Sequence, residues 1–92
     1  MARRIVKKLL PQYFQEILDG KKKFELRLND FEIEAGDMLV LEEYTTDDPA
    51  TRVATGRVLE REVTYVHKFK PQDLWWSEED IKEKGLQIIS FE

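Results

Sequence analysis

The sequence predicts one α+β domain over residues 1–92, in which short strands form a small mixed β-barrel and two helices cover its ends. Two observations lead to this fold class. Short β-favouring segments alternate with turns rich in Gly, Asn and Asp, and only two segments carry start and stop signals for a helix. The chain has 92 residues without repeats or a linker, which is the length of a single domain.

The first two elements are a strand and a helix. Ile5 and Val6 favour a strand. Pro11 fits the first turn of a helix, where its missing N–H costs nothing, and Gly20 stands where a left-handed cap ends a helix. One face of this helix is apolar and carries Tyr13, Phe14, Ile17 and Leu18. We therefore expect a helix of about ten residues before Gly20.

Residues 23–28 are predicted to form a half-buried strand because their character alternates. One face carries the charged side chains Lys23, Glu25 and Arg27. The other face carries the apolar side chains Phe24, Leu26 and Leu28. A carboxylate would thus lie between two cations on the polar face.

Two turns and a buried strand follow. Asn29 and Asp30 form the first turn, and Gly36 with Asp37 forms the second. Residues 38–44 are predicted to be a strand, and the apolar run 38–41 indicates burial on both of its faces. Residues 45–51 are polar and contain a proline, so we expect a hairpin loop there.

The last third is predicted to contain a long strand, a helix and a final strand. Residues 53–67 favour β structure, with a bulge or bend near Arg61 where neither face stays apolar. Ser77 caps a helix with Asp80 as its reciprocal partner, Trp76 and Ile81 have the spacing of a hydrophobic staple, and the helix ends at Gly85. Residues 86–91 form the final strand.

Composition excludes several classes of site. The chain has no cysteine, so it has neither disulfides nor thiolate metal sites, and His67 is its single histidine. A histidine metal site or a Ser-His triad within one chain is therefore not expected, and we predict no metal and no cofactor. No apolar run has transmembrane length and no signal peptide is visible, so we expect a cytoplasmic protein without membrane contact.

Charge is divided unevenly along the chain. Residues 1–27 hold eight Lys or Arg and three Asp or Glu, whereas residues 28–92 hold seven and sixteen. The basic part offers a surface for an anion, and the N-terminal pairs Arg3-Arg4 and Lys7-Lys8 can contact phosphates or simply face solvent. The acidic part leaves open another class of function, a module that binds a protein partner through its acidic surface.

Gly20, Lys22, Glu25 and Arg27 match the G-x-K-x-x-E-x-R signature of ASCH domains, a branch of the PUA-like proteins. With the helix before it and the Gly36-Asp37 turn after it, most of residues 8–67 resembles an uncharacterised bacterial, archaeal and phage branch of that superfamily. The resemblance implies a PUA-like mixed β-barrel of about five or six strands with two helices. It also implies a cleft lined by the signature residues.

The resemblance further implies binding of RNA or a modified nucleotide. The ligand-binding residues would be Gly20, Lys22, Lys23, Glu25 and Arg27. The alternative is an enzyme, either a metal-independent amidohydrolase acting on acetylated cytidine or a small ribonuclease. In the amidohydrolase branch the lysine at the position of Lys22 is catalytic, whereas the position of Glu25 is a threonine. A further glutamate follows the long strand there, and its regional candidates here are Glu78, Glu79 and Glu83.

The residues alone leave the geometry of the cleft open. In a regular strand Lys22 lies on the face opposite to Glu25 and Arg27. Either the turn after Gly20 brings Lys22 round, or Lys23 is the lysine that joins them. Glu25 would carry a proton in an enzyme, and Arg27 would bind phosphate or carboxylate with its fork of donors. Without the signature, an exposed salt bridge of Glu25 is the simpler interpretation.

Three further points stay open on sequence grounds. Trp75 is a candidate for base stacking, whereas the staple position favours the core for Trp76. His67 is either a surface residue, which we favour, or a proton shuttle. A monomer is favoured, although the sequence does not fix the oligomeric state, and the partner is expected to be RNA, a nucleoside or a nucleotide.

Overall fold

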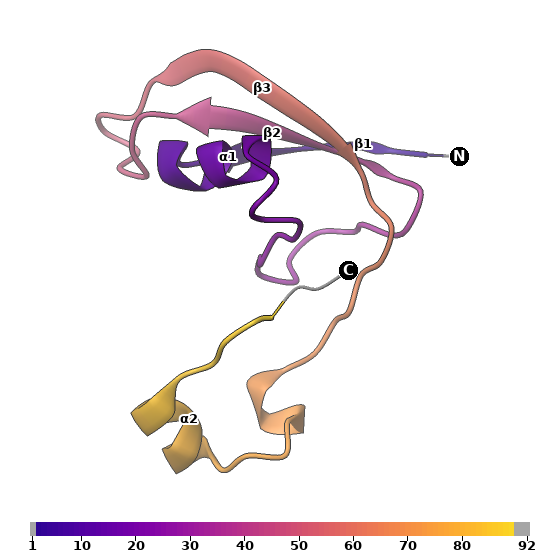
Figure 1. The fold of residues 1–92 in the computed structure, drawn as a ribbon, viewed down its shortest axis with the longest axis vertical. Helices are drawn as coiled ribbons and strands as arrows, with labels where there is room; N and C mark the ends of the chain where they lie inside the picture. The colour runs from indigo at the N-terminus through magenta and orange to yellow at the C-terminus, as the bar shows by residue number, and fades with distance from the viewer. Residues whose placement is uncertain (1, 90–92) are drawn as a thin grey trace.

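A computed structural model describes residues 2–89 of the chain. Its elements are β1 (Arg4–Leu9), α1 (Pro11–Leu18), β2 (Met38–Tyr44), β3 (Ala54–Glu62), a 3-10 turn (Pro71–Asp73) and α2 (Glu78–Lys84). The strands form one sheet in the order β1-β2-β3, with β1 parallel and β3 antiparallel to the central strand β2. Helix α1 lies against one face of this sheet (Figure 1). Within residues 2–89 no helix is long and apolar enough to cross a membrane.

The predicted PUA-like barrel of about five or six strands is wrong. The described part of the chain forms an open mixed sheet of three strands, and the sheet does not close on itself. Three segments predicted as strands are irregular in the described part of the chain: residues 23–28, residues 63–67, and residues 86–89 of the predicted final strand.

Residues 23–28 form no strand, although their side chains alternate. The Lys22 ammonium contacts the Glu25 carboxylate at 2.8 Å. In an extended strand, side chains three positions apart point to opposite faces and cannot meet. Residues 22–25 are therefore not a regular strand, and residues 23–28 pair with no other strand in the described part of the chain.

The strand predicted at residues 53–67 ends at Glu62, because its pairing partner β2 begins only at Met38. The pairing of β3 with β2 starts at Met38 and Glu62, and two backbone hydrogen bonds of Val63 extend it to Gly36 and Asp37. At Gly36, which has φ +96°, the segment that precedes β2 turns away from β3. Residues 64–67 thus have no strand beside them in the described structure. Residues 86–89 are also irregular, and the rest of the predicted final strand lies outside the described residues.

The bulge predicted near Arg61 is elsewhere. Arg61 pairs in regular register with Leu39. The register shifts between the pairs Glu42–Val58 and Tyr44–Ala54, so that residues 55–57 lie opposite the single residue Glu43. Gly56 within this bulge has φ +93°, a conformation that glycine adopts without a steric penalty.

Several local predictions are confirmed. The first strand, the helix that starts at Pro11, and the strand 38–44 occupy the predicted residues. The hairpin loop joins β2 to β3, and Gly85 follows the last residue of α2. Ser77 caps α2 by accepting a hydrogen bond from the N–H of Asp80 at 3.1 Å. All of these elements depend on signals within a few residues of sequence.

The core lies between α1 and the sheet. Its buried side chains come from α1 and from all three strands: Leu9, Phe14, Ile17, Leu41 and Leu59, with Leu39 packed against them. Val40, the neighbour of Leu41, is also buried, at 4% exposure. Because adjacent strand residues point to opposite faces, this confirms the predicted burial on both faces of β2.

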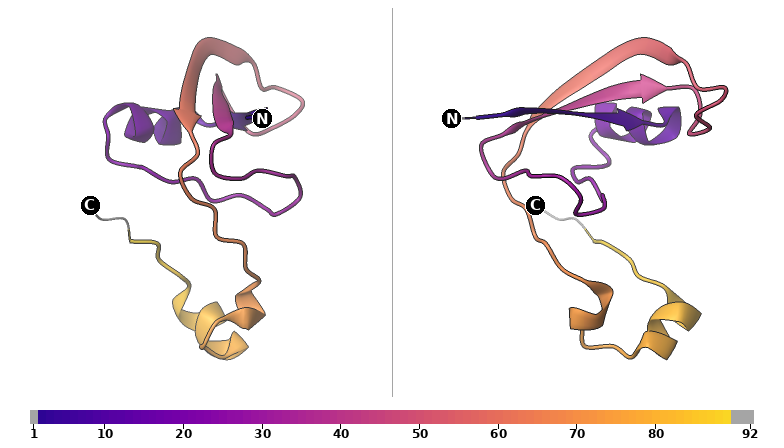
Figure 2. Two further views of the ribbon diagram at one scale, coloured as in Figure 1. Left: turned by 90° about the vertical axis from the view of Figure 1, so that its right-hand side faces the viewer. Right: turned by 180° about the vertical axis from the view of Figure 1, so that it is seen from behind.

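The segment after β3 extends away from the sheet as an arm that carries the 3-10 turn and α2 (Figures 1 and 2). The radius of gyration is 15.1 Å, compared with about 12 Å for a compact domain of this length. Trp76 is 52% exposed, so its predicted place in the core is wrong. Helix α2 stands apart from the sheet and does not cover the end of a barrel.

Candidate functional site

The end of α1 positions the first signature residues. The N–H of Gly20 donates to the carbonyl of Ile17 at 3.1 Å, and the N–H of Lys21 donates to the carbonyl of Glu16 at 2.9 Å. This is the hydrogen-bond pattern of a Schellman cap, with Gly20 at φ +76°. The N–H of Lys22 also donates to the Glu16 carbonyl, at 3.1 Å. The chain therefore folds back over the helix end and carries Lys22 with it.

The site contains one carboxylate held between two cations. Lys22 Nζ lies 2.8 Å from Glu25 Oε1, and Arg27 Nε lies 2.8 Å from Glu25 Oε2. The side chains of Lys22 and Glu25 are only 14% and 11% exposed, and that of Arg27 is 30% exposed. The turn after Gly20 thus brings Lys22 round to the other two, which was one of the two predicted possibilities.

Arg27 also ties this loop to the sheet. Its second terminal nitrogen donates to the backbone carbonyl of Lys8 in β1 at 2.5 Å. One guanidinium therefore contacts both the Glu25 carboxylate and the strand edge. A lysine at this position could not make both contacts in a planar fork.

Lys22 contacts a carboxylate and lies near two aromatic rings. Its Nζ lies 5.0 Å from the ring centre of Tyr13 and 5.3 Å from that of Phe24, in addition to its contact with Glu25. Aromatic faces and carboxylates both attract an ammonium group. In this geometry the Lys22 amine presents hydrogen-bond donors at the pocket wall, which suits the binding of an anionic ligand.

These residues line a pocket of about 640 Å³. All five predicted ligand-binding residues contribute to it: Gly20, Lys22, Lys23, Glu25 and Arg27. Apolar side chains such as Phe24, Phe31 and Leu39 form part of its wall, and residues 61–68 form the opposite side. This volume is in the usual range of small-molecule sites, and the lining combines apolar walls with a few polar groups as such sites do.

The pocket supports binding chemistry of two kinds. Lys22 and Arg27 donate to anionic oxygens, and Glu25 keeps a free lone pair on each oxygen to accept from a ligand N–H. Among residues 2–89, no group of three or more His, Asp or Glu is arranged to hold a metal ion. The polar lining of this pocket also includes a second carboxylate, Glu62, and the neutral side chains of Asn29 and Thr64.

A row of aromatic rings beside the pocket was missed in the sequence. The rings of Tyr65 and His67 are stacked with centroids 6.4 Å apart and an interplanar angle of 6°. The rings of His67 and Phe69 are stacked at 5.4 Å and 25°. Their alternate spacing in the sequence was the available signal. Taken singly, His67 is predicted to be a surface residue.

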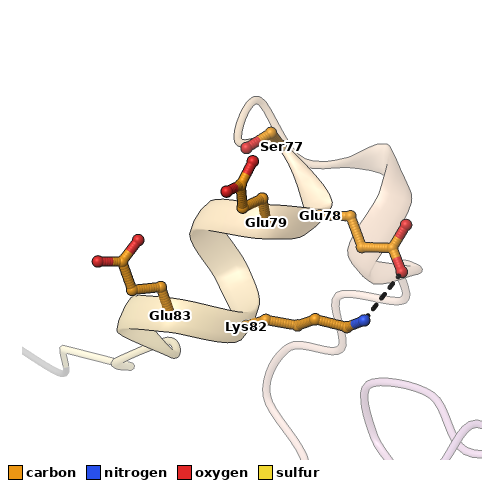
Figure 3. A pocket seen from close by; sticks show the side chains of 5 residues that line it. All are labelled: Ser77, Glu78, Glu79, Lys82 and Glu83. Carbon is orange, nitrogen blue, oxygen red and sulfur yellow. Dashed lines mark ion pairs between the residues drawn. The ribbon is translucent and has the colours of Figure 1, made fainter.

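The three downstream glutamates do not reach the signature residues. Glu78, Glu79 and Glu83 line a separate hollow of about 730 Å³ on α2, together with Ser77 and Lys82 (Figure 3). Glu78 forms a long ion pair with Lys82 at 3.9 Å. The structure therefore does not place a second carboxylate from α2 beside Lys22. Trp75, on the same arm, is 93% exposed and contacts the ring of Trp76 edge to face.

A second charged cluster lies in the sheet, and no sequence motif marks it. Glu43 is buried at 4% exposure, and its carboxylate accepts hydrogen bonds from Arg57 and from the Thr55 hydroxyl. The hydrogen bonds of Arg57, followed by that of Thr55, lower the pKa of the Glu43 carboxyl to about 2. The bulge opposite Glu43 supplies both partners, so this cluster fixes the hairpin and lies outside the pocket.

Asp37 anchors the turn before β2. The backbone N–H groups of Arg3 and Glu34 donate to its carboxylate at 3.0 and 2.9 Å, and these bonds lower the pKa of the Asp37 carboxyl. The Arg3 guanidinium adds an ion pair at 3.0 Å. The loop of residues 19–37, called the pocket loop below, is thereby held at its C-terminal end by Asp37, and Arg27 holds its middle.

The sequence matches a family whose function is unknown. The model of a family described as "Domain of unknown function (DUF3850)" matches residues 6–76. A protein of Escherichia phage P2, described as "Uncharacterized 12.9 kDa protein in GpA 3'region", is 41% identical over 59 residues. That match covers 64% of this chain and 50% of the phage protein, so the chain matches about half of that relative's length. No solved structure matches the chain.

Proposed function

The chain belongs to the family described as domain of unknown function DUF3850, and we propose that it binds RNA or a modified nucleotide in the pocket around Lys22, Glu25 and Arg27. A relationship to ASCH domains, based on the G-x-K-x-x-E-x-R signature, is part of this proposal. So are a cytoplasmic location and a monomeric state. The fold on which the site rests is the open three-stranded sheet.

One observation carries the proposal: two cations and a carboxylate meet in an aromatic-walled pocket of about 640 Å³. The guanidinium and ammonium groups suit phosphate oxygens. The Glu25 carboxylate accepts hydrogen bonds from the N–H groups on a base edge. The rings of Phe24 and Phe31 offer apolar surface to a planar base. A nucleotide presents all three of these chemical features.

The test compares Arg27→Ala with Arg4→Ala for binding of nucleoside monophosphates and of a labelled short RNA at low salt. Both variants remove one positive charge, but Arg4 lies outside the pocket and pairs with Glu60 at 2.6 Å. We expect Arg27→Ala to weaken binding roughly tenfold or more, because a charge-assisted hydrogen bond is lost. Arg4→Ala should leave binding nearly unchanged. Equal affinity of the wild type and Arg27→Ala, or no binding by the wild type, contradicts the proposal.

A second candidate, hydrolysis of acetylated cytidine or of RNA, is favoured by one distance. Lys22 Nζ and Glu25 Oε1 are 2.8 Å apart, which is close enough for proton transfer between them. In this alternative Lys22 and Glu25 are catalytic and no metal is required. The assay measures cytidine released from acetylated cytidine, and fragments released from RNA, by the wild type and by Lys22→Ala. Turnover abolished by Lys22→Ala supports an enzyme, whereas a wild type without turnover removes this candidate.

A further inference from the structure

The rings of Tyr65, His67 and Phe69 form an exposed row that the folded chain does not use in its core. Their centroids are 6.4 and 5.4 Å apart, and the rings are stacked with angles of 6° and 25°. Tyr65 is 76% exposed and Phe69 is 41% exposed. The three side chains therefore form a contiguous exposed aromatic surface, and such surfaces often mark a binding site.

We propose that this aromatic row, Tyr65-His67-Phe69, is a stacking surface for the bases of a single-stranded nucleic acid that also occupies the pocket. The inference rests on the proposed function, because it extends the pocket ligand from one nucleotide to a strand. It names the ligand class more narrowly: an unpaired strand of several nucleotides, and neither a free mononucleotide nor a duplex.

The spacing of the row carries the first step. Alternate residues of an extended chain repeat at about 6 to 7 Å. The ring separation of Tyr65 and His67, 6.4 Å, agrees with that repeat, and the rings of His67 and Phe69 are closer, at 5.4 Å. Aromatic side chains presented in this way bind successive bases of a single strand through their π-faces, without requiring a particular sequence. Bases within a duplex are stacked on each other and cannot offer their faces to the row.

The position of the row carries the second step. Tyr65 and His67 line the same pocket as Lys22, Glu25 and Arg27. The row therefore begins at the pocket wall and leads outward along the chain to Phe69. A strand with one nucleotide in the pocket has its next bases beside these rings.

Charge along the same segment carries the third step. Lys68 and Lys70 alternate with the aromatic residues, and the Lys68 side chain is 41% exposed. Its ion pair with Glu32 is long, at 3.8 Å, so little free energy opposes its exchange for a phosphate. The segment thus combines rings for bases with cations for the backbone, which is the combination found in single-strand binding grooves.

The experiment measures fluorescence anisotropy of labelled RNA and DNA oligonucleotides of one to six nucleotides and of one hairpin duplex. The proteins are the wild type, Tyr65→Leu and Phe69→Leu. Leucine keeps apolar volume at each site and removes the π-face, so the variants separate stacking from apolar contact. We expect the affinity of the wild type to rise with length up to about four nucleotides, and each leucine variant to weaken the longer oligonucleotides about tenfold.

Mononucleotide affinity should be the same in Phe69→Leu and in the wild type, because Phe69 does not line the pocket, and this separates the inference from the proposed function. Tyr44→Leu is the matched control, because it makes the same change in β2, outside the row and outside the pocket. A wild type that binds mononucleotides as tightly as oligonucleotides overturns the inference and leaves the pocket proposal standing. Longer oligonucleotides bound equally by the wild type and both row variants overturn it too, and so does a preference for the duplex.

Discussion

Arg57 grips Glu43 with two hydrogen bonds, Nε to Oε1 at 2.9 Å and the second terminal nitrogen to Oε2 at 2.6 Å. The same guanidinium lies 4.7 Å from the ring centre of Phe14 in α1. The Arg57 side chain of β3 therefore contacts both β2 and α1, the helix whose C-terminal cap leads into the pocket loop. The Glu43 side chain is only 5% exposed, so its charge depends on this partner.

Replacing Arg57 should destabilise the fold in a graded way. Arg57→Ala leaves the enclosed Glu43 carboxylate with the Thr55 hydroxyl as its remaining partner, so the urea midpoint should fall clearly. Arg57→Lys keeps a charge but not the planar fork, so its midpoint should fall between those of the wild type and Arg57→Ala. Arg4→Ala breaks an exposed pair and should change the midpoint little. Equal midpoints for all three variants would show that the Glu43 pair does not hold the hairpin.

Stability should fall in acid because of the same carboxyl. Its pKa is lowered from an ordinary value of 4.5 to about 2 in the folded protein. A group with a depressed folded pKa stabilises the fold above its unfolded pKa, and this contribution is lost as the pH falls from about 4.5 towards 2. Urea unfolding of the wild type and Glu43→Gln across this range measures the slope. The variant should show a shallower slope, with the remainder due to groups such as Asp37, whose pKa is also lowered. Identical slopes would refute this assignment.

Gly20→Ala tests the helix cap. The site has open space for a methyl group, so any penalty comes from φ +76° and not from a clash. We expect a loss of roughly 1 to 2 kcal/mol in unfolding free energy. Gly20→Asn should lose less, because asparagine tolerates left-handed backbone better. Because this cap turns Lys22 towards Glu25, ligand affinity should follow the same order of variants. An alanine variant as stable as the wild type would mean that the chain leaves the helix in another way.

Leu41→Ala tests whether the core lies where α1 meets the sheet. Leu41 is 1% exposed in the central strand, and removal of a buried leucine side chain costs about 2 to 5 kcal/mol. Val6→Ala, at a strand residue that is 53% exposed, should change stability by less than about 0.5 kcal/mol. Chemical denaturation of both variants measures the difference. A similar loss in the two variants would contradict this location of the core.

The sequence predicted the elements whose signals are local. Pro11 and Gly20 mark the two ends of α1, and the apolar run of residues 38–41 marks the buried central strand. The strand predicted at residues 23–28 was wrong because alternation describes a segment without saying whether another strand lies beside it. The second half of 53–67 failed for the same reason. A barrel closes only if each strand has a neighbour on both sides. The number of β-favouring segments in a sequence therefore does not predict closure.

The candidate site was predicted more closely than the fold around it. All five predicted residues line one pocket, because the signature lies within eight consecutive residues that a single cap turns together. The Glu43–Arg57 pair had no comparable signal, since the two residues meet only through the register and bulge of a hairpin. The row of Tyr65, His67 and Phe69 was visible as a spacing, but its meaning depended on the chain remaining exposed beside the pocket.

The parallel pairing of β1 with β2 has a consequence for the order of folding. The antiparallel partners β2 and β3 are joined by a short hairpin, whereas β1 reaches β2 only after α1 and the whole pocket loop have closed behind it. Closing the longer loop costs more entropy, so β1 should dock last and leave first. A ligand that holds the pocket loop in place would then slow the departure of β1. Occupancy of the pocket would then control the unfolding rate of β1. This coupling would pass from the ligand to Arg27 and from Arg27 to the Lys8 carbonyl of β1.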